Sequence, residues 1–387
     1  MPEVKSARSS TRMGKPGAAL RRRRERRESR RRALEEARRS PVTTEEEVEV
    51  TAAISDLESR LQSLRRAALL TELNDDLEDL DTALSELPLA IEQLRSRGYV
   101  FKGYLENKAR VLQEQWDDIR QRVVSEIDRR SRDLSRELER VEREVSRLHS
   151  GSSMAAVNSA QRAVAALADR IEAAEDAIEG MFDKLERNVS QTEDQIAHVN
   201  WMLDQIDAAS FRLYPNEAPI EAVEAQWLTD GKEGPKGILY LTDHRLLFEQ
   251  KEEIAKKKIL FITTEKELVQ ELRLEVPVGQ IQEVQESEKG FLFAKKELLD
   301  LAFSGDAPYP SARFVLKGDS EAWKVLIGRV LSGEIDKERT TPPEEAPAAP
   351  PKEIPTHCPT CGALITQEIV KGMVSITCEY CGTVIRL

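Results

Sequence analysis

Apolar residues recur every three or four positions through residues 45–209, and this spacing constrains the fold more than any other feature of the chain. The most regular stretch consists of Val157, Ala160, Val164, Leu167, Ile171, Ala174, Ile178, Met181 and Leu185. Such spacing keeps one apolar seam turned toward a partner helix, as in a coiled coil. Charged residues fill most other positions and proline is nearly absent. We therefore predict that residues 45–210 form a helical, coiled-coil region.

Two glycine-containing breaks divide this region into helices of about 45–97, 99–149 and 153–209. One break is Arg97-Gly98, and the other is Ser150-Gly151-Ser152-Ser153. If both breaks reverse the chain, the seams pack within one molecule as a three-helix bundle. If either continues straight, the seam needs a second copy of the chain. Pro88 is expected to kink the first helix.

The composition suits long solvated helices beside smaller folded units. Of the 387 residues, 33% are charged and only 5% are aromatic, which is too few large core residues for one large globule. The length indicates two or three domains. No segment has the apolar length of a signal peptide or a membrane span, so we expect a cytoplasmic protein, with peripheral attachment to the inner face of the membrane as an extension of that expectation.

Residues 1–44 form a basic arm that we expect to be disordered. Its first 40 residues contain thirteen Arg and two Lys against five Glu, about +10, although the whole chain carries −12. The arginines in the densest run are Arg21, Arg22, Arg23, Arg24, Arg26, Arg27, Arg30, Arg31 and Arg32. Such a run can contact the phosphates of nucleic acid or of anionic lipid. Alternatively, the arm is a solvated tail or rests on the acidic helices of the same protein.

The periodicity changes at Phe211, and residues 211–334 read as short strands followed by one helix. The candidate strands are Ala222–Trp227, Gly237–Leu241, Arg245–Glu249, Ile259–Ile262, Leu268–Val276, Ile281–Gln285, Leu298–Phe303 and Arg313–Leu316. Asp319 or Ser320 can cap the helix, and Trp323 lies on its apolar face. Strands closed by one helix indicate a small β-barrel or sandwich.

The stretch from Gly237 to Phe248, Gly-Ile-Leu-Tyr-Leu-Thr-Asp-His-Arg-Leu-Leu-Phe, resembles the GRAM group of pleckstrin-homology-like (PH-like) domains. The later Val276-Pro277-Val278-Gly279-Gln280-Ile281 is similar to the step that follows in that group. The resemblance covers about 211–334. It implies a seven-strand barrel with a C-terminal helix that binds lipid headgroups or protein segments.

Lysines supply the candidate contacts of this domain with lipid or with a partner. Lys232 and Lys236 lie in the first strand-to-strand loop, where lipid-binding members of the wider fold carry several basic residues. Lys256, Lys257 and Lys258 form a second basic run in a later, lengthened connection, which could equally be a solvated loop.

A proline-rich linker, residues 335–355, leads to a cysteine-containing module at 356–387. The cysteines are Cys358, Cys361, Cys378 and Cys381, and the chain has no others. Two C-x-x-C pairs separated by sixteen residues are typical of a structural four-thiolate zinc site. Two disulfides would require an oxidising compartment. The module is similar to a zinc ribbon, with short strands between and after the cysteine pairs.

The sequence contains no G-x-S-x-G, H-E-x-x-H or phosphate-loop motif, and we predict that the protein is not an enzyme. The leading hypothesis is a multi-module interaction or scaffold protein. Its helices would space or oligomerise it, and its PH-like domain would dock to a membrane surface or a protein partner. The alternative is a nucleic-acid-associated protein that uses the arginine arm and the zinc ribbon. No small-molecule substrate is predicted.

Overall fold

The computed structural model describes residues 18–38, 46–229, 232–259, 262–289, 295–341, 357, 361, 364–365, 375–378, 381–382 and 384–386. The chain divides into two units. Among the described residues, the first unit contains six helices, a seven-stranded sheet and a closing helix, and the second contains a small two-stranded sheet near the C-terminus.

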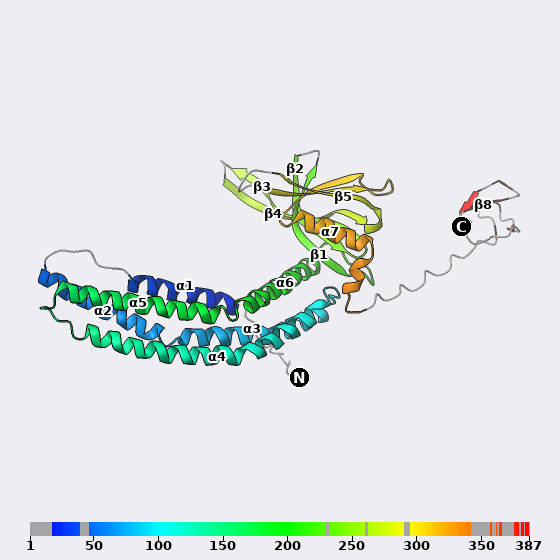
Figure 1. Cartoon of the computed structure of the whole chain (residues 1–387). Helices are drawn as coiled ribbons and strands as arrows, with labels where there is room; N and C mark the ends of the chain where they lie inside the picture. Colours follow the sequence, from blue (N-terminus) through cyan, green and yellow to red (C-terminus); the bar gives the residue numbers. More distant parts are fainter. Residues whose placement is uncertain are drawn as a thin grey trace, which may run out of the picture. The chain divides into compact units, whose positions relative to one another are not determined.

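Three helical rods pack on one another within the chain (Figure 1). The first rod consists of α2 (Glu46–Ala67) and α3 (Thr71–Ser96), the second is α4 (Tyr104–Val145), and the third consists of α5 (Met154–Glu179) and α6 (Asp183–Asp207). Each rod buries its apolar seam against the other two. Of the two arrangements left open by the sequence, the structure has the intramolecular one.

The ends of the rods follow local backbone chemistry. Gly98 has a φ of 86°, in the left-handed region that glycine tolerates, where the first rod ends. The Ser153 Oγ accepts a hydrogen bond from the Ala156 N–H at 3.3 Å and so caps α5. The breaks inside the first and third rods were not expected. Leu70, with a φ of 53°, separates α2 from α3, and Gly180 ends α5.

Seven antiparallel strands follow the bundle. They are β1 (Pro219–Thr229), β2 (Lys232–Thr242), β3 (Arg245–Ile259), β4 (Ile262–Pro277), β5 (Ile281–Lys289), β6 (Lys296–Phe303) and β7 (Ser311–Leu316). Their order is β4-β3-β2-β1-β7-β6-β5, so β4 and β5 lie at opposite ends of the sheet. The sheet is therefore open between β4 and β5 rather than closed into the expected barrel. Residue pairing joins β1 to both β2 and β7, so β1 connects the half of the sheet that contains β2, β3 and β4 to the half that contains β5, β6 and β7.

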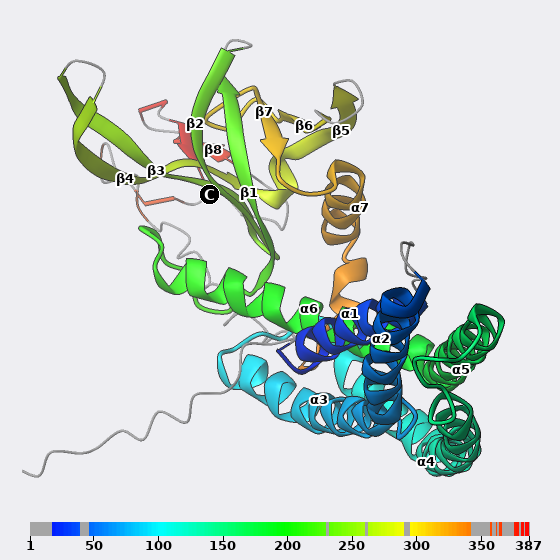
Figure 2. The same cartoon turned by 90° about the vertical axis from the view of Figure 1, so that its left-hand side faces the viewer.

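Both faces of the first half of the sheet are apolar. Ile238 and Tyr240 of β2 belong to the same buried cluster as the helical seams, because α6 packs against this face (Figures 1 and 2). Leu239 and Leu241 point to the opposite face and form the interior of the sheet with Phe248 and other residues. One continuous apolar core thus extends from the bundle into the sheet.

The end of the first unit returns to the bundle. β7 leads into α7 (Ser320–Leu331), whose first turn is capped by Asp319, and then into the short 3-10 helix η2 (Glu334–Glu338). The Gly103 N–H donates to the Glu338 carbonyl at 2.8 Å, and the Thr340 N–H donates to the Val100 carbonyl at 2.8 Å. The segment after α7 is therefore fastened to the loop between α3 and α4.

The second unit contains β8 (Ser375–Thr377) and β9 (Val384–Arg386), which pair antiparallel. His357 and Leu364 form a separate bridge. Among the described residues of the whole chain, no helix is long and apolar enough to cross a membrane.

Candidate functional site

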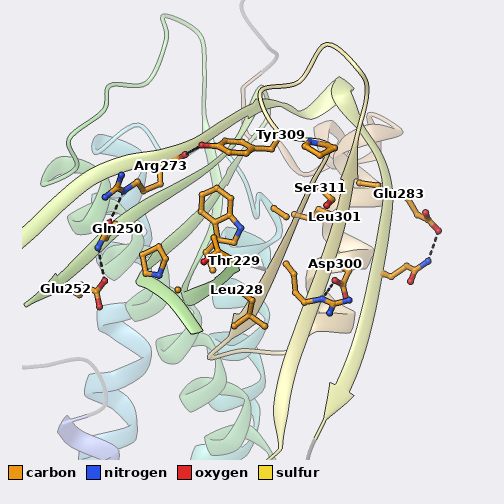
Figure 3. Close-up of a pocket in the computed structure, with 18 residues that line it drawn as sticks. Leu228, Thr229, Gln250, Glu252, Arg273, Glu283, Asp300, Leu301, Tyr309 and Ser311 are labelled. Carbon is orange, nitrogen blue, oxygen red and sulfur yellow. Dashed lines mark hydrogen bonds and ion pairs between the residues drawn. The ribbon is translucent and has the colours of Figure 1, made fainter. Parts of the chain in front are cut away.

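The open end of the seven-stranded sheet contains a cavity of about 1010 Å³ (Figure 3). Its walls come from both halves of the sheet, including β1, β3 and β4 on one side and β5, β6 and β7 on the other. A closed barrel of this size would fill its interior with side chains. Because β4 and β5 do not pair, space remains between them, and we call this space the corner cavity.

The inner wall of the corner cavity is aromatic. The Trp227 ring is 8% exposed and packs edge-to-face on Tyr309, with ring centroids 5.1 Å apart. Phe248 and Phe314 pack behind Trp227. The Tyr309 hydroxyl donates to the Arg273 carbonyl at 3.3 Å, so Tyr309 connects the turn before β7 to β4 across the opening.

Acidic and basic groups are nearly balanced around the corner cavity. The charged lining residues are Glu252, Glu283, Asp300, Arg273 and Arg313. Arg313 forms an ion pair with Asp300. Arg273 Nε donates to Gln250 Oε1 at 2.8 Å, and Gln250 Nε2 donates to Glu252 Oε1 at 2.8 Å. This lining lacks the excess of positive charge that would draw in a multiply charged phosphate.

The candidate lysines belong to β2 and β3, so Lys232 and Lys236 lie in a strand rather than in the expected loop. Lys236 is exposed, and its N–H donates to Glu252 Oε1 at 3.3 Å near the cavity. Lys232 begins β2, where it is opposite Thr229. The side chains of Lys232, Lys256, Lys257 and Lys258 lie outside the described residues.

The structure changes the element to which the second lysine run is assigned. Lys256, Lys257 and Lys258 belong to β3 rather than to a connection, and the separate strand predicted at Ile259–Ile262 is wrong. β3 pairs with β2 only from Leu246 to Gln250, whereas its ladder with β4 continues to the Ile259–Ile262 pair. The outer part of the β3–β4 hairpin thus extends beyond the strand that supports its base.

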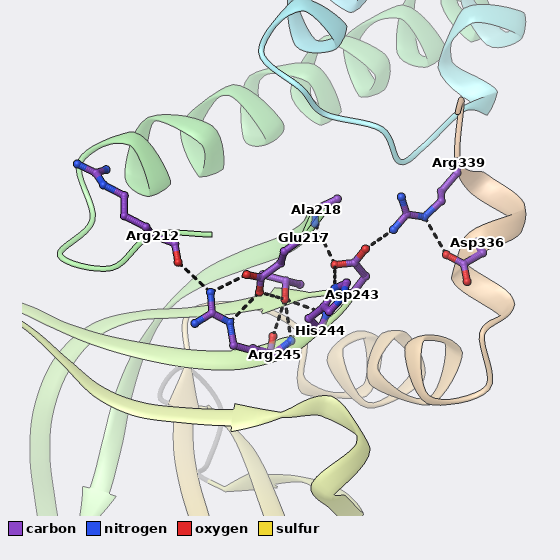
Figure 4. Close-up of polar contacts among 9 residues, drawn as sticks. Arg212, Glu217, Ala218, Asp243, His244, Arg245, Asp336 and Arg339 are labelled. Atoms are coloured by element: carbon purple, nitrogen blue, oxygen red, sulfur yellow. Dashed lines mark hydrogen bonds and ion pairs between the residues drawn. The ribbon is translucent and has the colours of Figure 1, made fainter. Parts of the chain in front are cut away.

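His244 lies beside a buried ion-pair network (Figure 4). Its Nδ1 is 2.7 Å from Asp243 Oδ1, and its ring is half exposed. Next to it, Arg245 Nη2 contacts Glu217 Oε2 at 2.6 Å, and Glu217 is fully buried. Burial alone would lower the pKa of Arg245, but Glu217 and Glu275 raise it above its ordinary value. The network fastens the chain that enters β1 to β3 and β4.

Three of the predicted metal ligands lie together. The Sγ atoms of Cys361, Cys378 and Cys381 are all within 4.8 Å of one another, and Cys361 Sγ is 3.7 Å from Cys378 Sγ. This is far longer than the ~2.05 Å of a disulfide bond. Gly382 has a φ of 75°, and its N–H donates to the Cys378 carbonyl at 2.9 Å, which turns the chain at the second pair. Cys358 lies outside the described residues.

The arginine run differs most from expectation. Instead of a disordered arm, Ala18–Arg38 form the helix α1, which packs on α2, α3 and α5. Arg24, Arg31 and Arg32 are exposed, whereas Arg26, Arg27 and Arg30 contact carboxylates of α3 and α5. The side chains of Arg21, Arg22 and Arg23 lie outside the described residues. A helix forms because the acidic bundle supplies counter-charges, as the alternative of an arm resting on the protein's own helices anticipated.

Sequence reasoning missed the residues that line the corner cavity. Trp227 was assigned only to a strand, and Tyr309 was not singled out, although it stands between Pro308 and Pro310 where a turn exposes an aromatic ring. Arg273, Asp300 and Arg313 come from three strands, and only the folded sheet brings them to one opening.

No family model matches the sequence. No curated protein matches it either. Among solved structures, the chain is similar to the N-terminal PH domain of Vps36, with 16% identity, over 32% of this chain and 85% of that one, at a TM-score of 0.22. It is also similar to the DH/PH domains of p115-RhoGEF, with 14% identity, over 82% of each chain, at a TM-score of 0.22. The DH/PH fragment of PDZRHOGEF, solved with human RhoA, has 13% identity, over 67% of this chain and 70% of that one, at a TM-score of 0.24. At these scores none of the three likenesses specifies a function for the chain.

Proposed function

We propose that the chain is a non-enzymatic interaction protein whose sheet domain, a member of the PH-like group, docks to an anionic membrane surface through the β3–β4 hairpin. In this proposal the helical rods act as a spacer that carries the sheet domain. The observation that carries this proposal is the extension of the β3–β4 ladder past the edge of β2.

The backbone register gives the hairpin a distinct outer end. Lys257 is opposite Glu265, Lys258 is opposite Thr263, and Ile259 is opposite Ile262. Between the two isoleucines the sequence reads Leu260-Phe261, and these two residues lie outside the described part of the chain.

The composition of this end matches a membrane interface. Four consecutive apolar residues, from Ile259 to Ile262, follow directly on three lysines. Apolar side chains gain free energy by entering the boundary between headgroups and acyl chains, and each lysine near an anionic surface adds about 1 kcal/mol. The corner cavity, in contrast, has no excess of positive charge, so we assign membrane contact to the hairpin.

Vesicle sedimentation with the full chain tests the proposal. We expect binding to vesicles that contain phosphatidylserine, little binding to phosphatidylcholine alone, and weaker binding in added salt. Lys257→Glu with Lys258→Glu should lower the affinity at least about tenfold, because two favourable charges become unfavourable.

Lys317→Glu with Lys337→Glu is the matched control. These lysines are 77% and 78% exposed and carry the same charge change elsewhere on the first unit. An equal loss in both double variants would assign binding to overall charge rather than to the hairpin. The absence of any wild-type binding to phosphatidylserine vesicles would refute membrane docking.

The cysteine cluster fits a structural zinc ion. Zinc–sulfur bonds of about 2.3 Å in a tetrahedron place two sulfurs about 3.8 Å apart, close to the 3.7 Å between Cys361 and Cys378. Cys358 would complete the four ligands. Four thiolates leave no open position on the ion, so we assign zinc a role in folding the C-terminal unit.

Metal analysis of the purified full chain tests this assignment. We expect one zinc per chain, reduced in Cys378→Ser, because loss of one thiolate weakens the site. Ser375→Ala, which changes a nearby residue of β8, is the control and should retain the metal. A wild-type protein purified without chelators and free of zinc would contradict the assignment.

A second candidate function is binding of a protein segment in the corner cavity. It is favoured by the size of the cavity and by its aromatic wall with polar groups on both sides. A photo-crosslinking residue at Tyr309 should capture a partner that the same residue at Tyr104, which is 41% exposed, does not capture. Equal capture at both positions would contradict a specific site.

Nucleic-acid binding through α1 and the ribbon stays a prediction. Arg26, Arg27 and Arg30 contact carboxylates of the bundle, so a nucleic acid would have to compete for them. Deleting residues 1–40 should abolish any such binding, and unchanged affinity would exclude the arm.

A further inference from the structure

One face of α1 carries a regular pattern of residues directed at the bundle. Arg26, Arg30 and Leu34 are spaced by four, so they share one side of the helix. Arg30 is 8% exposed and Leu34 is 2% exposed. Arg24 and Arg31 lie on the solvent side, with side chains 84% and 75% exposed. The helix is thus divided into a bundle-facing and a solvent-facing side, both of them basic.

The bundle offers a matching set of carboxylates, which we call the acidic recess: Asp76 of α3 with Glu175 and Glu179 of α5. Asp76 is fully buried, and Glu175 and Glu179 are 6% and 2% exposed. Arg30 contacts Asp76 Oδ2 at 3.1 Å and Glu179 Oε1 at 2.6 Å. Arg26 contacts Asp76 Oδ1 at 3.2 Å. One helix therefore inserts two guanidinium groups between two rods of the bundle.

The described side chains of α1 contact the bundle mainly through charged groups. Among the described side chains of α1, at positions 24–36, Leu34 is the only apolar one that is buried. Three buried carboxylates without cations would be costly, because removing one partner of a buried ion pair leaves an uncompensated buried charge. The recess consequently favours any helix that supplies arginines at this spacing.

Seven residues of sequence, 39–45, separate α1 from α2. α1 ends at Arg38 and α2 begins at Glu46. The intervening residues 39–45 can span roughly 23 Å when extended. An identical helix from another molecule would make identical contacts in the recess, so exchange between copies changes only the connection and the concentration dependence.

We propose that the acidic recess is a docking site for a helix of the pattern Arg-x-x-x-Arg-x-x-x-Leu, which α1 occupies as a tethered ligand and which α1 of a second copy can occupy in its place. This chain itself contains the motif, so we favour a second copy of the chain over an unrelated basic helix as the occupant. Two molecules would then be joined by reciprocal exchange of α1, without any contact between their sheet domains.

A labelled peptide of residues 18–38 tests the recess. In the full-length Arg26→Glu/Arg30→Glu variant, α1 carries negative charges that are repelled by the acidic recess of the same chain. It should bind the peptide at least about tenfold more tightly than the wild type does, because tethered α1 competes at a high effective concentration. A peptide with the same two substitutions should bind neither protein. Failure of the variant to bind the peptide, or equal binding by the wild type, would overturn the proposal.

The full-length Arg24→Glu/Arg31→Glu variant is the matched control, with the same charge change on the solvent side of the same helix. It should bind the peptide as weakly as the wild type. If the reversed variant does not fold, Arg26→Gln/Arg30→Gln removes the charges without adding repulsion and takes its place in the same measurement.

Mixing two full-length variants tests the second copy as occupant. Glu175→Lys/Glu179→Lys retains the arginines of α1 but loses the recess, and Arg26→Glu/Arg30→Glu retains the recess but loses the arginines. Light scattering should show a mixed dimer that neither folded variant forms with itself. Two folded variants that stay monomeric on mixing would overturn docking in trans.

Discussion

α5 and α1 are neighbouring helices of one bundle, yet different forces hold them. Val157, Val164, Leu167 and Ile171 of α5 are fully buried and form an apolar seam. Among the described side chains of α1, at positions 24–36, Leu34 is the one buried apolar residue, and Arg26, Arg27 and Arg30 contact carboxylates. Apolar seams are recognised from periodicity within a helix, whereas the position of a charged helix depends on distant partners. The contrast teaches that an apolar seam makes a helix predictable from its own sequence, whereas α1, which we expected to be disordered, depends on carboxylates far away in the sequence.

The largest expected effect comes from the apolar side of this comparison. Trp116 of α4 is fully buried between the rods and packs on Phe182. Trp116→Ala should lower the free energy of unfolding by about 3–5 kcal/mol, because it leaves a cavity. Urea denaturation at low and high salt would measure the loss. A strong dependence of this loss on salt would contradict an apolar rod core.

Asp76→Asn tests the charged side and should have a smaller effect. It weakens one partner of both Arg26 and Arg30, but Asp79 still contacts Arg26 and Glu179 still contacts Arg30. We expect a loss of roughly 1.5–3 kcal/mol, the range for hydrogen bonds to charged groups. Asp75→Asn, an exposed neighbour on the same helix, should be neutral within about 0.5 kcal/mol. Equal losses in both variants would remove the special role of Asp76.

Glu175→Gln should have the smallest effect on the free energy of unfolding, and above neutral pH it should raise this free energy rather than lower it. Burial raises the pKa of Glu175 from 4.5 to about 7, with Arg30 opposing this shift and Glu179, Glu72 and Asp176 adding to it. The folded protein therefore holds this proton more tightly than the unfolded chain, and wild-type stability falls as pH rises from 4.5 through 7.

The variant cannot ionise at this position and escapes that loss. At pH 8 it should be more stable than the wild type by roughly 1–3 kcal/mol, and at pH 4 the two should be equal. Unfolding curves at both pH values would check this. A variant less stable than the wild type at pH 8 would show that the attraction of Glu175 to Arg30 outweighs its burial.

The sequence predicted those features that depend on local periodicity or spacing. The three helical ranges overlap the observed rods, and the cysteine spacing anticipated that Cys361, Cys378 and Cys381 lie together. The αL conformation of Leu70 was missed because leucine carries no signal for a positive φ. The lysine run was placed in a loop because it lacks apolar alternation, yet pairing with β4 makes it a strand.

The corner cavity was beyond prediction for a different reason. Its walls combine Trp227, Arg273, Asp300 and Tyr309 from segments far apart in the sequence. Nothing in any single segment signals that β4 and β5 fail to pair. Both ends of a sheet must be known before the space between them can be described.

The apolar core shared by the bundle and the sheet has a consequence for cooperativity. Ile238, Tyr240 and Leu247 of the sheet, with Ile335 of η2, are buried in the same cluster as the helical seams. If either the helices or the sheet unfolded alone, the apolar side chains of the other that it covers would be exposed to water. The helices and the seven strands should therefore unfold in one cooperative transition. A calorimetric scan should show one heat-absorption peak for the first unit, whereas two independent domains would give two peaks.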